Sequence, residues 1–417
     1  MAHDVRTLIA PLKDDDHVVV VGAGLAGWRF VQALRRDGFS GSISLIGDEA
    51  HHPYDRPPLS KQVLKGAWEK DKTLLAHASD LDDANVDALF GVSATALDVA
   101  TTTVSLSDGR VIRGSHVVVA SGTRARRLPF SADKEMLALR NLDDVENLLQ
   151  AVENLAPHTT VVVIGGGFIG AEVATALKTR ELSPIVLEVA ERPLLNVLGP
   201  QVSEWLIGLA SDAGIELRCS QNISDVTFED GLFRVHVGDD VLATPVVVVG
   251  AGAMPNTEWL GSSGLDITNG VAVDEFLMAT SHVGAIGDVA RFKWLHGPFE
   301  EMVRIEHWQV ANDHAQELAK ILIQGSDVAG PVKLVPYFWS DQYGKKIQML
   351  GHPSPSDEVT RVTGSPEEGK WLALFHRSGV ITGAVSLNQP RGLILARPLV
   401  SEHANIGEAL ELKPWLA

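Results

Sequence analysis

Two stretches of the chain place glycines at the spacing G-x-G-x-x-G directly after a run of β-branched residues. They are GAGLAG at residues 22–27 and GGGFIG at residues 165–170. In such a turn the first glycine permits a sharp exit from a strand, the second lets the backbone approach a diphosphate, and the third lets a helix pack closely on the strand. The unpaired N–H groups that begin the helix attract negative charge. Two such turns predict two bound dinucleotides.

Carboxylates follow each turn at the distance where a ribose is bound in this kind of fold. Asp48 lies 26 positions after Gly22, and Glu188 lies 23 positions after Gly165. A carboxylate at the end of the second strand accepts hydrogen bonds from ribose hydroxyls. Glu49 is the alternative to Asp48 in the first half of the chain.

The second carboxylate also bears on the choice of coenzyme. Glu188 would repel a 2′-phosphate, which favours NADH over NADPH. Arg192 follows closely and could receive that phosphate. The sequence predicts NADH, provided that Glu188 does not point away from the turn.

Composition narrows the class of protein. The chain has 417 residues, 45% of them hydrophobic and 21% charged, which is typical of a globular protein. A formal charge of −18 argues against nucleic acid as a partner. No apolar run approaches the ~20 residues that span a bilayer, so we expect no membrane contact and a cytoplasmic location. Cys219 is the single cysteine, and we expect it to be a small buried residue far from both turns.

A proline-rich loop brings cations close to the first turn in sequence. Residues 51–61 read HHPYDRPPLSK, and they include Arg56 and Lys61. This segment resembles P-Y-x-R-P-x-L-S-K of the FAD-dependent ferredoxin reductases, the NADH components of Rieske dioxygenase and cytochrome P450 electron chains. The resemblance implies that Lys61 lies beside the flavin ring, where it can stabilise charge on the reduced form.

The resemblance continues in order through residues 117–124, 139–144, 285–290, 304–312 and 336–342. It implies that Arg140, Asp288 and Trp308 contact FAD. Glu172 has two interpretations, as a complement to the helix dipole or as a carboxylate near the nicotinamide. We predict Lys61 and Glu172 as catalytic residues and no metal site. The predicted cofactor contacts are Gly22, Gly24, Leu25, Ala26, Gly27, Asp48, Glu49, Arg56, Ser60, Lys61, Ala94, Ala120, Gly122, Arg140, Gly165, Gly167, Phe168, Ile169, Gly170, Glu188, Arg192, Gly252, Gly287, Asp288 and Trp308.

These motifs imply an α/β fold of the glutathione-reductase type, with two Rossmann-like dinucleotide-binding domains and a C-terminal α+β domain. We expect an FAD-binding domain from residues 1–121 and 254–330. An NADH-binding domain is expected from residues 122–253, and the C-terminal domain from residues 331–417.

The expected function is hydride transfer from NADH to FAD, followed by transfer of single electrons to a ferredoxin, of the 2Fe–2S type, that serves an oxygenase. Disulfide reductases share both turns but need a redox cysteine in the first domain, and residues 22–120 contain none. Monodehydroascorbate reductases and proteins of the apoptosis-inducing-factor type remain alternatives. The oligomeric state is left open between monomer and dimer.

The negative total charge opposes an acidic ferredoxin. We therefore expect a local basic patch at the flavin edge, drawn from Lys61, Lys65, Arg291, Lys293, Lys345 and Lys346.

Overall fold

The computed structural model describes residues 8–132, 134–296 and 298–416, and these fold as two compact units. Unit 1 comprises the described residues up to Asp55 together with Thr73–Arg124 and Pro255–Pro336. Unit 2 comprises Arg56–Lys72, Ala125–Met254 and residues 337–416. The three domain boundaries expected from the sequence stay a prediction.

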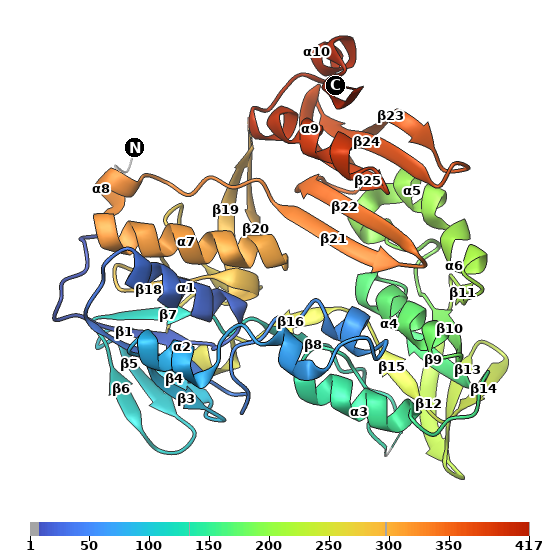
Figure 1. Cartoon of the computed structure of the whole chain (residues 1–417), viewed down its shortest axis with the longest axis horizontal. Helices are drawn as coiled ribbons and strands as arrows, with labels where there is room; N and C mark the ends of the chain where they lie inside the picture. The colour runs from blue at the N-terminus through green and yellow to red at the C-terminus, as the bar shows by residue number, and fades with distance from the viewer. Residues whose placement is uncertain (1–7, 133, 297, 417) are drawn as a thin grey trace. The chain divides into compact units, whose positions relative to one another are not determined.

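Unit 1 is built on a parallel sheet whose strand order is β18-β7-β1-β2-β3. Its valine-rich central strands are buried on both faces, as a parallel sheet covered by other elements requires. Helices α1 and α7 pack side by side (Figure 1). The elements are β1 (His17–Val21), α1 (Leu25–Arg36), β2 (Ser42–Gly47), β3 (Asp87–Phe90), β7 (His116–Val119), β18 (Val283–Ala285) and α7 (Trp308–Gln324).

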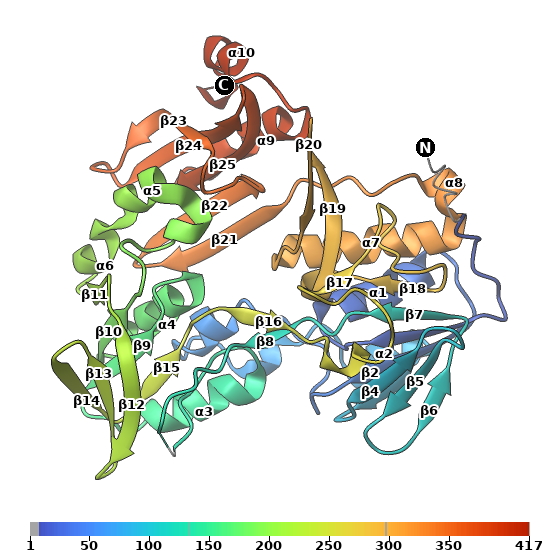
Figure 2. The same cartoon turned by 180° about the vertical axis from the view of Figure 1, so that it is seen from behind.

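Two smaller sheets complete unit 1. An antiparallel meander of β4, β5 and β6 is seen from behind in Figure 2, and β17, β19 and β20 form the other sheet. The remaining helices are short. The bounds are α2 (Ala78–Asp83), β4 (Ala94–Asp98), β5 (Thr103–Leu106), β6 (Val111–Arg113), β17 (Val271–Ala272), β19 (Ala290–His296), β20 (Phe299–Val303) and α8 (Ser326–Ala329).

Unit 2 repeats the parallel arrangement with the strand order β11-β10-β9-β15. Helix α4 follows β9, and an antiparallel meander of β12, β13 and β14 precedes the last parallel strand. The bounds are α3 (Leu142–Val152), β9 (Thr160–Ile164), α4 (Phe168–Thr179), β10 (Ser183–Leu187), α5 (Leu195–Leu206), α6 (Gly208–Asp212), β11 (Glu216–Arg218), β12 (Ile223–Glu229), β13 (Leu232–Val237), β14 (Asp240–Thr244) and β15 (Val247–Val249).

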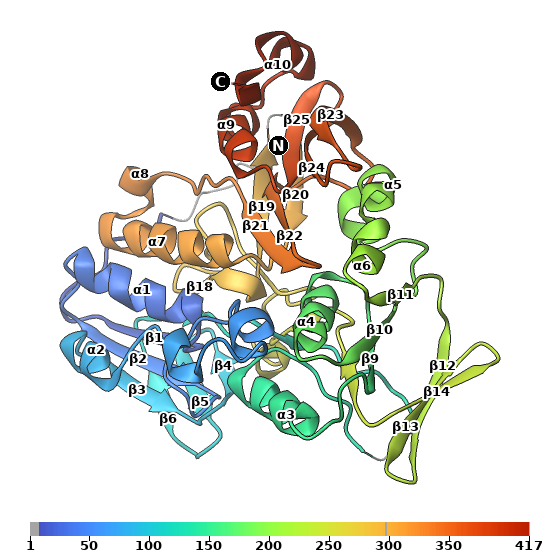
Figure 3. The same ribbon diagram turned by 45° about the vertical axis from the view of Figure 1, so that its right-hand side comes forward.

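The C-terminal part of unit 2 is an antiparallel sheet with the order β21-β22-β25-β24-β23, covered by α9 (Figure 3). It packs on the preceding part of the unit through Trp205 and Trp371, whose rings meet edge to face at 5.1 Å. The bounds are β21 (Tyr337–Gln342), β22 (Lys345–Gly351), β23 (Glu358–Ser365), β24 (Lys370–Arg377), β25 (Val380–Leu387), α9 (Pro390–Ser401) and α10 (Ile406–Leu412).

The chain passes from unit 1 to unit 2 within β8 (Thr123–Ala125) and returns within β16 (Ala253–Pro255). The proline-rich loop crosses into unit 2 as well, where Leu59–Val63 forms the short π-helix η1. Among the residues that the structure describes, no helix is long and apolar enough to cross a membrane.

Candidate functional site

The first glycine turn has the geometry that its sequence predicts. Gly22 has a φ of +124°, and a Cβ there would lie 2.1 Å from the Ala120 carbonyl oxygen. A Cβ on Gly27 would lie 1.9 Å from the Gly22 oxygen, so the helix packs directly on the turn. Gly24, in contrast, has nothing within 4 Å of an added Cβ, and no side chain caps α1. This open glycine beside uncapped N–H groups fits a diphosphate.

Other predicted FAD residues of unit 1 lie around this turn. Gly287, with a φ of +70°, packs so closely that a Cβ would lie 2.9 Å from the Cβ of Ala26. Asp288 follows in the short 3₁₀-helix Gly287–Val289, and its carboxylate accepts a hydrogen bond from the Thr123 hydroxyl at 3.5 Å. The structure therefore brings together the glycine turn, the Ala120–Thr123 segment and Asp288.

The two turns differ in the residue that follows the second strand. The amide of Gly22 donates to the Ile46 carbonyl and that of Gly165 to the Leu187 carbonyl, so Gly47 occupies the position of Glu188. A Cβ on Gly47 would lie 2.8 Å from the Cβ of Ala23, which leaves no room for a carboxylate.

The carboxylates predicted to bind the ribose in unit 1 are the next two residues, Asp48 and Glu49. Asp48 is exposed, whereas Glu49 accepts a hydrogen bond from the Tyr54 hydroxyl. The assignment of either residue as the ribose ligand stays a prediction.

Two more FAD contacts predicted in unit 1 come from elements outside the turn. Trp308 is the first residue of α7, and its indole N–H donates to the Asp55 carboxylate at 2.6 Å. Ala94 is the first residue of β4. Their contacts with FAD stay predictions.

The second glycine turn repeats the first in unit 2. A Cβ on Gly165 would lie 2.5 Å from the Gly250 oxygen, and one on Gly170 would lie 1.9 Å from the Gly165 oxygen. Gly167 has nothing within 4 Å of an added Cβ. No side chain caps α4, whose first two residues are Phe168 and Ile169. Unit 2 therefore offers a second open anion site of the same design.

Glu188 points toward this turn. One carboxylate oxygen accepts the amide of Gly166 at 2.7 Å, and the other accepts the amide of Ala190 at 2.8 Å. Arg192 is held by Glu204, with 2.6 Å between Nε and the carboxylate. The condition for NADH preference, that Glu188 faces the turn, is thus met in this structure.

The expected isolation of Cys219 from both turns is wrong. The residue follows β11 directly, at the same sheet edge as Glu188, and the charge of Glu188 acts on its thiol. Partial burial and then Glu188 raise the pKa of Cys219, so the thiol is a poor nucleophile at neutral pH.

A buried ionic cluster lies on α4, one turn beyond the glycines. Glu172 is 2% exposed, and its carboxylate accepts hydrogen bonds from Ser60 at 2.5 Å and from the Lys61 ammonium at 2.8 Å through one oxygen. The other oxygen accepts from the Ser340 hydroxyl at 2.5 Å and from the Asp341 amide at 3.3 Å. Because a buried charge needs such partners, these four donors keep the carboxylate in one place.

The cluster joins residues that the sequence predicted separately. Lys61 and Glu172 form an ion pair, which sequence spacing does not reveal. The Ser60 hydroxyl is directed at Glu172, and Arg56 donates to the Arg140 carbonyl at 2.9 Å. Sequence reasoning missed Ser340 as a member of the site. The only signal was its position in the 336–342 segment that resembles the reductases.

The expectation that Lys61 belongs to a basic surface patch is wrong, because Lys61 is 7% exposed and forms an ion pair with Glu172. Three further members form ion pairs at the surface: Arg291 with Asp266, Lys293 with Glu300 and Lys346 with Asp341. Together with Lys65 and Lys345, they stay predicted members of a docking surface.

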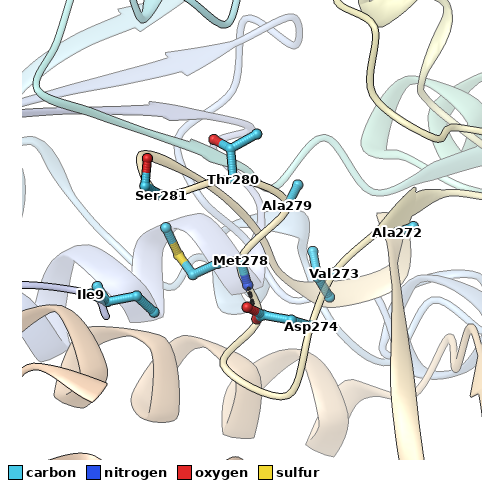
Figure 4. A pocket seen from close by; sticks show the side chains of 8 residues that line it. All are labelled: Ile9, Ala272, Val273, Asp274, Met278, Ala279, Thr280 and Ser281. Carbon is cyan, nitrogen blue, oxygen red and sulfur yellow. Dashed lines mark hydrogen bonds between the residues drawn. The ribbon is translucent and has the colours of Figure 1, made fainter. Parts of the chain in front are cut away.

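A pocket of about 290 Å³ lies in unit 1, lined by Ile9 and by residues 272–274 and 278–281 (Figure 4). Asp274 accepts the amide of Met278 there at 2.9 Å. None of the lining residues belongs to a predicted cofactor site.

Comparison with known proteins shows which family this chain belongs to. Residues 16–315 match the family described as pyridine nucleotide-disulphide oxidoreductase, and residues 337–412 match the family described as reductase C-terminal. The chain therefore belongs to the pyridine nucleotide-disulphide oxidoreductases and, among them, to the ferredoxin reductases that the sequence resembles. The predicted fold class is confirmed, and so are FAD and NAD(H) as cofactors.

Individual relatives agree with this placement. The chain is 36% identical to the ferredoxin–NAD(+) reductase subunit of a benzene 1,2-dioxygenase system of Pseudomonas putida, with 92% of each chain covered. It is 33% identical to rhodocoxin reductase of Rhodococcus erythropolis, over 92% of this chain and 89% of that one. A crystal structure of a covalent putidaredoxin reductase–putidaredoxin complex matches with a TM-score of 0.87, 28% identity, and coverage of 96% of this chain and 98% of that one.

Proposed function

We propose that this protein passes a hydride from NADH to FAD and then delivers single electrons to a ferredoxin that serves an oxygenase, in the cytoplasm. The observation that carries the proposal is the pair of open glycine turns, one in each unit, combined with the buried Lys61–Glu172 pair. The relatives support it, because their names describe ferredoxin reductases of dioxygenase systems and putidaredoxin reductase.

In unit 1, the turn at Gly22–Gly27 is proposed to hold the FAD diphosphate. Asp288 is proposed to bind the ribityl and phosphate region, and Asp48 or Glu49 the adenosine ribose. When bound, FAD supplies a two-electron acceptor that can release electrons one at a time. The protein contributes the positions of the two cofactors and the electrostatic environment around them.

In unit 2, the turn at Gly165–Gly170 is proposed to hold the NADH diphosphate, with the adenosine ribose on Glu188. Glu172 stands on the same helix as this turn, and it would act near the nicotinamide together with Lys61. Thiol chemistry is disfavoured as a route for the electrons, because Cys219 is the single cysteine and its pKa is raised.

Steady-state turnover with NADH and a set of acceptors tests the proposal. We expect cytochrome c to be reduced rapidly only when a 2Fe–2S ferredoxin is present, and ferricyanide to be reduced without it. Fast direct reduction of monodehydroascorbate, with no gain from ferredoxin, would move the protein to the alternative function. A protein that does not bind FAD would overturn both.

A further inference from the structure

We propose that Ser340 is a positioning residue for hydride transfer, acting through Glu172. The C-terminal sheet would then complete the reactive part of unit 2. This inference rests on the proposed function, because it assumes that NADH bound at Gly165–Gly170 reacts beside Glu172. All the contacts that carry it lie within unit 2.

The first support is that two different chain segments bind the two oxygens of Glu172. Ser60 and Lys61, both from η1, bind Oε2. Ser340 and the Asp341 amide, both from β21, bind Oε1. The carboxylate is therefore fixed from two sides by two separate chain segments.

The second support is the burial of the Ser340 hydroxyl. Its side chain is 0% exposed, so no solvent molecule can replace the hydroxyl without a rearrangement of the sheet. The Gln342 side chain donates to the Ser340 oxygen at 3.3 Å, which leaves the Ser340 proton directed at Glu172. A donor held in this way is preorganised for one acceptor.

The third support is the place of β21 at the edge of the C-terminal sheet. An edge strand leaves outward N–H groups without a strand partner. Here the Asp341 amide is satisfied by Glu172, and in the turn directly after β21 the Tyr343 amide donates to the Thr175 hydroxyl at 2.8 Å. Helix α4 thus acts as the covering element for this edge, and the Glu172 carboxylate is part of the contact.

The same geometry defines what a change at Ser340 should do. Removing the hydroxyl leaves Oε1 with only the longer contact to the Asp341 amide, so the carboxylate can rotate and carry the Lys61 ammonium with it. A misplacement of about 1 Å near reacting atoms costs up to roughly a hundredfold in rate. Binding of the distant adenosine half of NADH does not depend on this contact.

The test compares Ser340→Ala with Ser386→Ala. Ser386 lies on β25 of the same sheet, is also 0% exposed, and has an unpaired hydroxyl among the described residues, which makes it a matched control. We expect Ser340→Ala to lower the limiting rate of flavin reduction by NADH about tenfold in stopped-flow experiments. The NADH dissociation constant should change less than about twofold. Ser340→Thr, which keeps the hydroxyl, should restore the rate.

Two further measurements separate positioning from a general loss of structure. In a Glu172→Ala background, Ser340→Ala should have no additional effect on the rate, because the two residues act as one unit. Amide hydrogen exchange of the FAD-loaded protein should show faster exchange at Asp341 in Ser340→Ala and no change in Ser386→Ala.

Equal rates for Ser340→Ala and the wild type, or an equal loss in Ser386→Ala, would overturn the inference. So would an undiminished effect of Ser340→Ala in the Glu172→Ala background. If Ser340→Thr does not retain FAD, the comparison of Ser340→Ala with Ser386→Ala alone decides whether Ser340 is a positioning residue. Failure of the proposed function is distinguishable from failure of this inference. In that case NADH would not reduce the flavin of the wild-type protein, or ferredoxin would have no effect on turnover.

Discussion

Replacement of Glu188 by alanine should weaken the preference for NADH. The carboxylate stands at the carboxyl end of β10 and is aimed at the turn by the amides of Gly166 and Ala190. Each oxygen keeps a second lone pair that can accept a ribose hydroxyl. In the proposed binding mode, the adenosine ribose of NADH meets a preorganised acceptor, and a 2′-phosphate would meet a fixed negative charge.

The size of the effect follows from two changes that both lower the ratio of NADH use to NADPH use. Loss of a hydrogen bond to a charged group costs about 1.5–3 kcal/mol, which lowers kcat/KM for NADH by about tenfold to a hundredfold. Removal of a like charge about 4 Å from the 2′-phosphate gains between about 1 kcal/mol in water and about 4 kcal/mol near a protein surface. Together these predict that the ratio of kcat/KM for NADH to that for NADPH falls by about a hundredfold or more in Glu188→Ala.

Steady-state ferricyanide reduction with each coenzyme measures this ratio. Glu204→Ala is the matched control, because it removes a carboxylate on α5 that binds Arg192. We expect that control to change the ratio less than about fivefold, with the small gain for NADPH that a released Arg192 allows. A wild-type protein that uses both coenzymes equally would refute the reasoning. A Glu188→Ala variant with an unchanged ratio would refute it too.

Three further predictions concern FAD, stability and docking. Gly24→Ala should fold normally but bind FAD at least tenfold more weakly, since an added Cβ meets only the open space proposed for the diphosphate. Flavin absorbance measures this, and weak binding that is matched by a loss of folding would contradict it. Burial and then His282 lower the pKa of His116 from 6.5 to about 4, so the unfolded chain binds the extra proton between those values. Titration of His116 alone should therefore lower the free energy of unfolding by about 2–3 kcal/mol between pH 7.5 and pH 4.5, and urea titrations of His116→Gln should show a fall that is smaller by this amount. Lys345→Glu should weaken ferredoxin-dependent turnover at low salt, where the Debye length is ~30 Å, and leave ferricyanide reduction intact. Equal losses with both acceptors would place the damage at the flavin site.

The parts of the fold that could be predicted are those set by local patterns. The valine runs before Gly22 and Gly165 are buried strands, and the glycines take up the turns that their spacing implies. These patterns work because a parallel strand, a tight turn and a helix start each depend on residues close in sequence. The alternating runs of residues 337–375 also form strands of the C-terminal sheet.

The cluster at Glu172 could not be predicted in the same way. Its members come from three chain segments that are separated by more than a hundred residues, and Ser60 and Ser340 are ordinary polar residues when read alone. Lys61 was expected both at the flavin and in a surface patch, yet burial and the ion pair exclude the patch. Contacts of this kind depend on how distant segments pack, which no short motif encodes.

The two glycine turns show how one local design can serve two dinucleotides. Both have an open second glycine, and so both offer the same anion site. They diverge at the residue after the second strand, where unit 2 has Glu188 and unit 1 has Gly47, packed against Ala23. A carboxylate fastened to the turn therefore exists only in unit 2 among the described residues of these two turns. In unit 1 the carboxylates proposed for the ribose, Asp48 and Glu49, lie further along the loop. In the proposed binding mode, the shared part of the motif binds the diphosphate, and the residues at the strand end discriminate between coenzymes. The Glu188 variant tests this discrimination.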